Sequence, residues 1–291
     1  MGSESFDNNH AKPSMPDIEQ KIEEITGLIS LPEIYLKVRR LMDDEKSDID
    51  DFAQVIIVDP NLSTRVLKIV NSAYFGFQEP VDSITRAINM VGIGQLHNMV
   101  LGVAAISSLD LPNDILPLKP FWHNSLYTGV LSQQLAGRLN LPRSDRMFMA
   151  GLLHEIGHLV LCAKLPDHAR EAIRVSVQSG RPLHEIQQQM LNCHYGDIAA
   201  MLLDNWKLPT ELKDLVRYHP EPLSAPSQQL ETALLHLAHA YAGRNTSSLD
   251  DAGELIDADI LSLIELTQDE INECLETAKS VSVEIGKSIL S

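Results

Sequence analysis

The sequence has little of several features that particular protein classes need. Only 3 of its 291 residues are cysteine, and aromatic residues make up 5%. No two of the three cysteines, Cys162, Cys193 and Cys274, have the spacing of a CxxC motif. An odd and sparse set of this kind is typical of a reducing compartment and argues against a disulfide framework.

Basic charge and long apolar runs are also scarce. The 23 Lys and Arg residues stand against 40 Asp and Glu, so the net charge is −17. Binding to nucleic acids or to anionic membranes needs clustered cations, which this balance disfavours. The apolar runs fall short of the roughly 20 residues of a membrane helix, and MGSESFDNNH is unlike a signal peptide. We therefore expect a cytoplasmic protein with neither nucleic acid nor membrane as a partner.

The sequence does contain a helical pattern through most of its length. Apolar residues recur at helical spacing from Asp17 onward, and no alternating pattern is long enough for a sheet. The predicted fold class is all-α. The proline-rich segment DLPNDILPLKP, residues 110–120, is the best internal boundary. It gives a flexible N-terminus at 1–16, an N-terminal helical subdomain at 17–110, a second helical subdomain at 117–245 and C-terminal helices at 252–291.

Some helix ends can be predicted from capping residues. Ser47 or Asp48 can cap a helix that ends before Asp59-Pro60, and Asp82 can cap another. Thr267 and Glu270 form a capping box for the last helix. In the second subdomain the periodicity predicts helices at about 121–139, 145–164, 166–179, 182–205, 210–218 and 229–243.

The histidines are the most informative residues. Helical phase places imidazoles on the apolar faces of five helices, from His123, His154, His194, His219 and the pair His236 and His239. One buried histidine is usually a core residue bonded to a carbonyl. Five on converging helices are costly to bury unless something takes up their lone pairs, and a transition metal does so.

One string in this region matches a known zinc motif. His154-Glu155-Ile156-Gly157-His158 has the HExxH spacing of a zinc-protease helix, although no downstream motif accompanies it.

Longer strings resemble a different family. WHNS with His123 and GLLHEIGHLVL with His154 and Glu155 resemble the HD superfamily of metal-dependent phosphohydrolases. The match is closer to its HDOD (HD-related output domain) branch of bacterial signalling proteins. Residues 31–106 resemble the N-terminal half of that family, and HYGDIAAMLLDNWKLPTELKDLVRYHPEP resembles its C-terminal half. The resemblance covers about residues 20–243 and displaces the zinc-protease interpretation.

The resemblance implies an N-terminal helical bundle packed on an HD-like helical domain. It also implies one or two ions of Fe, Mn, Ni or Zn, with ligands from His123, His154, Glu155, His194, His219 and His239. Two positions depart from the superfamily pattern: Glu155 replaces the aspartate of the His-Asp doublet, and His239 stands at the late aspartate. The family is generally regarded as regulatory, and the replacement of both aspartates favours the same role here.

Three functions remain open at this point. The first is a non-catalytic signalling module with a protein partner. The second is a phosphohydrolase acting on a phosphoester or nucleotide, in which Glu155 bridges metal ions and His158 or His194 is the proton donor. The third is a nucleotide sensor that binds a phosphorylated small molecule without hydrolysing it.

Overall fold

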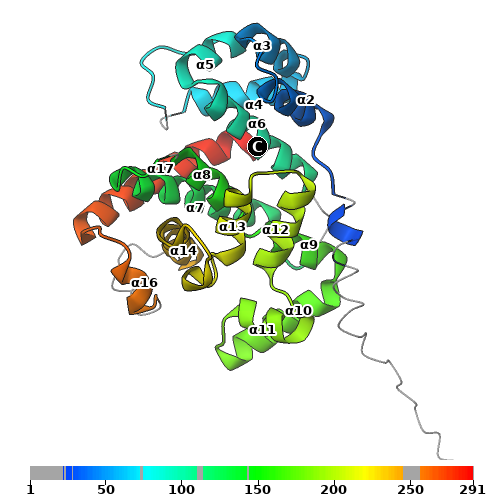
Figure 1. Ribbon diagram of the computed structural model, residues 1–291, viewed down its shortest axis with the longest axis vertical. Coiled ribbons are helices and arrows are strands. Elements are labelled where there is room, and N and C mark those ends of the chain that lie inside the picture. Colours follow the sequence, from blue (N-terminus) through cyan, green and yellow to red (C-terminus); the bar gives the residue numbers. More distant parts are fainter. Residues whose placement is uncertain are drawn as a thin grey trace, which may run out of the picture.

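The computed structural model describes residues 22, 24–27, 29–72, 75–109, 114–142, 144–244 and 256–290. Within these ranges every regular element is a helix, so the all-α prediction is confirmed (Figure 1). The predicted flexible N-terminus at 1–16 and the start of the proline-rich boundary, residues 110–113, lie outside the described residues.

The N-terminal helices begin where short polar side chains cap them. Asp48 forms a capping box at the start of α3, Asp59 caps α4 and Ser83 caps α5, one residue later than the predicted Asp82. Gly92 joins α5 to α6 with a φ of +86°, a backbone conformation that favours glycine. The helices of this half are α2 (Glu33–Met42), α3 (Ile49–Ile57), α4 (Pro60–Val70), α5 (Ile84–Val91) and α6 (Ile93–Ser108).

The second half continues with shorter helices around a long central one. Its elements are α7 (Leu118–Arg138), α8 (Ser144–Leu153), α9 (Ile156–Lys164), α10 (Pro166–Ser179), α11 (Leu183–Leu191), α12 (Tyr195–Asn205), α13 (Thr210–Tyr218), a 3-10 turn (Pro222–Ser224) and α14 (Gln229–Arg244). The C-terminal helices are α16 (Ala258–Ser262) and α17 (Gln268–Ile289). The predicted Thr267–Glu270 capping box is present at the start of α17.

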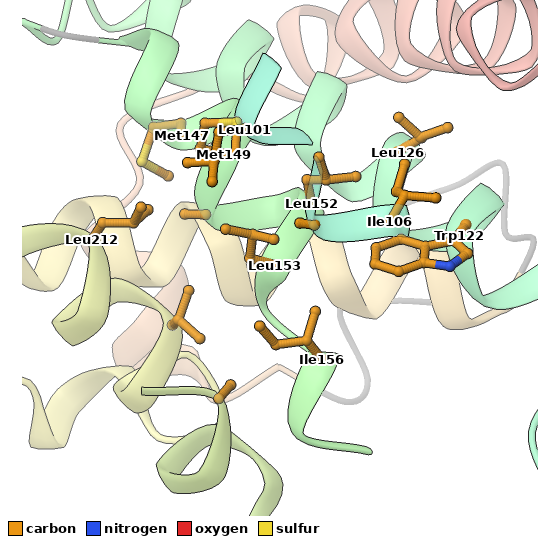
Figure 2. Packing of buried hydrophobic residues seen from close by; sticks show 14 of the residues in the cluster. Leu101, Ile106, Trp122, Leu126, Met147, Met149, Leu152, Leu153, Ile156 and Leu212 are labelled. Carbon is orange, nitrogen blue, oxygen red and sulfur yellow. The ribbon is translucent and has the colours of Figure 1, made fainter. Parts of the chain in front are cut away.

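The two halves share one apolar core. Figure 2 shows Leu101 of α6 beside Met149 of α8, and Ile106 of α6 beside Leu126 of α7, all of them buried. Gly102 allows this approach, since an added Cβ would lie 2.9 Å from the Leu152 side chain. The long helix α17 packs on both α7 and α4, so it also ties the halves together (Figure 1).

Within the described residues, one helix is apolar enough to span a membrane by length and composition, and there are two such stretches if a bent helix pair is taken as one span. One is Arg146–Lys164, and the other is the bent pair α5 and α6, which turns by 119° at their junction. Of the apolar window in Arg146–Lys164, 72% is buried inside the fold, as in the core helix of a soluble protein.

Two helices predicted as continuous are broken, and each break lies at a histidine. The predicted helix at 145–164 is interrupted at His154 and Glu155, between α8 and α9. The predicted helix at 182–205 ends at Leu191 because Asn192 adopts a left-handed φ of +59°. His194, in extended conformation, then starts α12. Apolar periodicity alone shows neither break, because buried apolar residues lie on both sides of each one.

Candidate metal centre

Three of the predicted histidines meet in the second half of the molecule. His154 comes from the turn between α8 and α9, His219 follows α13, and His239 lies on α14. One ligand nitrogen from each lies within 4.8 Å of the other two. The ring centroid of His154 is 4.9 Å from the ring centroid of His219 and 4.9 Å from that of His239. We call these three residues the histidine centre.

Backbone carbonyls fix the orientation of the two fully buried imidazoles. His154 Nδ1 lies 2.7 Å from the Gly151 carbonyl oxygen, and His219 Nδ1 lies 2.7 Å from that of Val216. Because a carbonyl only accepts hydrogen bonds, each Nδ1 carries the proton and each Nε2 keeps its lone pair. This is the arrangement that metal-ligating histidines usually have.

The third imidazole completes the group from the exposed side. His239 Nδ1 lies 2.8 Å from His154 Nε2 and donates to it when no metal is bound. To bind a metal through Nδ1, His239 would move its proton to Nε2. Its side chain is 30% exposed, whereas those of His154 and His219 are completely buried.

Burial keeps the histidine centre uncharged. It lowers the pKa of His154 and of His219 well below the ordinary 6.5, and neighbouring histidines lower both further. Burial also lowers the pKa of His239 to about 4, because protein surrounds the ring on most sides. Neutral imidazole is the form that binds metal, so the centre is in its ligating state at neutral pH.

Glu155 and His158 lie at the edge of the centre. The Glu155 carboxylate oxygens are 3.8 Å from both His154 Nε2 and His239 Nδ1, and 3.9 Å from His158 Nε2. Burial raises the pKa of Glu155, and burial lowers the pKa of His158 to about 4. The Glu155 carboxylate is therefore near enough to become a further ligand after a small side-chain movement.

A close backbone contact brings Tyr195 to the centre. An added Cβ at Gly157 would lie 1.9 Å from the Tyr195 carbonyl oxygen, so α9 rests directly on the start of α12. The Tyr195 ring stacks on His158 at 3.9 Å, and its hydroxyl lies 3.3 Å from His219 Nε2. The sequence reasoning did not single out Tyr195. Its only signal was its place in the string HYGD, directly after His194.

His194 is close to the centre but has a different task. Its Nδ1 accepts a hydrogen bond from the Gly196 N–H at 3.0 Å, and its own backbone N–H donates to Asp197. It therefore caps α12, and the predicted helical phase does not apply to it because the helix starts there. Within the described residues His194 is not part of the group whose nitrogens converge.

His123 lies elsewhere and is likewise outside that group. It is on α7, and its ring faces Gly286 of α17, where an added Cβ would lie 2.6 Å from His123 Cε1. Helical phase placed His123 on the apolar face of its helix, and the neighbour on that side is the C-terminal helix. His236, by contrast, supports the centre, because its Nδ1 donates to the His219 carbonyl at 2.8 Å.

The donor set fits a first-row transition metal. Imidazoles with an adjacent carboxylate suit Zn, Fe and Ni. In the part of the chain that the structure describes, His154, His219 and His239 are the one group of three such donors within reach of a single ion. The geometry therefore places three nitrogen donors within reach of an ion, with Glu155 beside them.

Comparisons with known proteins agree with this fold. A crystal structure from Shewanella amazonensis SB2B, named "Putative phosphohydrolase", is 25% identical, with a TM-score of 0.78 over 95% of this chain and 100% of that one. A "Putative signal transduction protein" from Marinobacter aquaeolei VT8 is 20% identical, with a TM-score of 0.69 over 97% of this chain and 67% of that one.

Sequence comparison identifies the family directly. An uncharacterized protein of Treponema pallidum is 27% identical over 209 residues, which are 71% of this chain and 40% of that relative. The chain thus spans less than half the length of that relative. The family model for the HDOD domain matches residues 28–222, which is more than half of the chain. The protein therefore belongs to the HDOD domain family.

Proposed function

We propose that this protein is a regulatory module of a bacterial signalling pathway that holds one transition-metal ion at the histidine centre without catalysing hydrolysis. The observation that carries the proposal is the convergence of three neutral imidazoles, two of them oriented by backbone carbonyls. The proposed location is the cytoplasm, and the proposed partner is another protein of the pathway. The name of the Marinobacter protein supports the signalling role.

The free energy needed to bury the imidazoles of His154 and His219 favours a bound metal. His154 and His219 are completely buried, and their Nε2 lone pairs point toward a shared space with His239. Within the described structure, the His219 Nε2 lone pair receives one weak contact from the Tyr195 hydroxyl, and the His154 Nε2 lone pair receives one hydrogen bond from His239. A metal ion would engage all three nitrogens and return the energy lost on desolvation. When bound, such an ion supplies Lewis acidity to a water or phosphoryl oxygen.

The ligand chemistry favours a structural or sensory role for that ion. The position of the late aspartate holds His239, and the doublet carries Glu155 in place of aspartate. A Glu carboxylate is one methylene farther from its backbone, and catalysis is sensitive to displacements of about 1 Å. Metal binding tolerates such a displacement better.

Hydrolysis of a phosphoester is the second candidate. Glu155 and His158 beside the centre favour it, as does the name of the Shewanella relative. However, with a pKa of about 4, His158 lacks at neutral pH the second proton that a leaving group would receive. The nucleotide-sensor alternative has less support, because Arg217, a candidate phosphate ligand, donates to Asp197 at 2.9 Å.

The test is the metal content of the purified, tag-free full chain. We expect about one equivalent in the wild type and in His123→Gln, and less than about a tenth of an equivalent in His239→Ala. His239 is partly exposed, so its replacement should leave the helices intact, which circular dichroism checks. Equal metal content in His239→Ala and the wild type would overturn the proposed centre.

Turnover separates the two candidate functions. The metal-loaded wild type is compared with the metal-deficient His239→Ala variant on a panel of phosphomonoesters and cyclic nucleotides, with Mn, Fe and Ni supplied in turn to both. We expect no difference between them. Hydrolysis present in the wild type and lost in His239→Ala would establish the phosphohydrolase instead.

A further inference from the structure

His123, which the histidine centre does not use, lines a separate cavity. This cavity has a volume of about 320 Å³ and is lined by residues of α7, α14 and α17. Its size is at the lower end of the range for small-molecule sites. Its lining includes His123, Tyr127, Leu275, Glu276, Lys279 and Val283.

The floor and walls of the cavity are mostly apolar. Leu275 is buried in the core, and the Val283 side chain is 45% exposed at the mouth. Tyr127 is mostly buried, and burial together with Glu276 raises its pKa to about 12, so its hydroxyl is a neutral hydrogen-bond donor. Gly286 leaves room for the His123 ring against the backbone of α17. The interior thus suits a compact hydrocarbon group.

The rim of the cavity carries one charge of each sign. Glu276 and Lys279 both line it and are both exposed, one helical turn apart on α17. Among the described residues neither forms an ion pair, whereas Glu273 on the same helix pairs with Arg138. An apolar cavity with two unpaired opposite charges at its entrance is complementary to a ligand with an apolar body and a zwitterionic head.

We propose that this cavity binds a small zwitterion with an apolar side chain, of the α-amino acid class and the size of leucine or phenylalanine. The ammonium group faces Glu276 and the carboxylate faces Lys279. The side chain lies between Tyr127, Leu275 and Val283. This site is independent of any metal at the histidine centre and gives the module a small-molecule input.

Calorimetry on the full chain tests the ligand class. The probes are L-phenylalanine and L-leucine, the N-acetyl derivative of phenylalanine without the ammonium charge, its amide without the carboxylate, and glycine without the apolar body. We expect the two amino acids to bind and each of the other three to bind at least about tenfold more weakly.

Variants locate the site, each with a matched control. Val283→Trp fills the mouth and should abolish binding, whereas Val177→Trp, on α10 and 78% exposed, should leave it unchanged. Glu276→Gln and Lys279→Gln should each weaken binding on the order of tenfold, and Asp269→Asn on the same helix should not. None of these positions belongs to the core, so the variants should fold.

Two outcomes would overturn the proposal. One is that neither amino acid binds at concentrations up to about 10 mM. The other is that the N-acetyl derivative or the amide binds as tightly as the free amino acid, which would identify a pocket for apolar anions or amines. Metal content is measured on the same samples, and it should be unaffected by Val283→Trp, so failure here is distinguishable from failure of the metal proposal.

Discussion

The histidine centre and the cavity at His123 place histidine in two different settings. At the centre, three neutral imidazoles face one another and two of them are fixed by carbonyls. At the cavity, one imidazole rests on a glycine of α17 and faces an apolar space with charges at its rim. Both sets of histidines look alike in sequence, as polar residues on apolar helical faces. The difference shows that helical phase tells which side of a helix a residue occupies but not which helix it meets.

The largest expected effect is on the backbone packing that builds the centre. Gly157→Ala would place a Cβ 1.9 Å from the Tyr195 carbonyl oxygen, so α9 and α12 would have to separate. We expect unfolding free energy to fall by about 3 kcal/mol or more in urea denaturation, with loss of metal.

Gly137→Ala is the matched control for that substitution. Gly137 lies near the end of α7, and nothing lies within 4 Å of an added Cβ. The same exchange there should raise stability by about 0.5–1 kcal/mol, since alanine favours helix. A similar loss at both positions would show that α9 and α12 do not approach as closely as described.

Metal removal should separate the two regions next. If the ion is present at about 100 times its dissociation constant, a chelator should lower stability by about 2.7 kcal/mol. Thermal unfolding should show this in the wild type and in Val283→Trp, but not in His239→Ala. A chelator effect that persists in His239→Ala would place the metal elsewhere.

The pH dependence of the metal-free protein gives a third comparison. The folded pKa of His158, about 4, lies below its ordinary 6.5. Between these pH values the unfolded chain binds a proton that the folded chain does not, so stability is present above pH 6.5 and falls as pH is lowered toward 4. The slope is up to about 1.4 kcal/mol per pH unit for each such histidine.

His158→Gln isolates one of these contributions. Denaturant titrations at several pH values should show a shallower acid loss for this variant than for the wild type. Burial raises the pKa of Glu155, which gives a slope of opposite sign just above its ordinary pKa in both proteins. Identical slopes in the two proteins would contradict a depressed pKa at His158.

The smallest effect concerns the helix that closes the cavity. Thr267→Ala removes the capping box of α17 and should cost about 1 kcal/mol, which is roughly 2–4 °C in Tm. Thr277→Ala is the control, since the Thr277 hydroxyl only bonds to the Glu273 carbonyl within the helix. Weaker amino-acid binding with unchanged metal content is the expected result. Loss of metal in Thr267→Ala would show that the two regions are not separate.

Much of the architecture could be predicted from local signals. Asp48 and the pair Thr267 and Glu270 cap helices as the sequence indicates, because a cap depends on residues within one turn. Two helix breaks could not be predicted in the same way. The turn at His154–Glu155 lies between two buried helices and leaves no polar gap in the pattern. Asn192 ends α11 through a left-handed conformation that asparagine only sometimes adopts.

The sequence predicted that histidines form the candidate site, but it did not predict which of them meet there. The sequence by itself determined an all-helical chain with imidazoles on buried faces, since periodicity and residue type are local properties. Only the tertiary structure decided that His154, His219 and His239 meet, that His194 caps a helix, and that His123 faces α17. The physical reason is that a metal site needs nitrogens within a few ångströms, and that proximity depends on how distant helices pack.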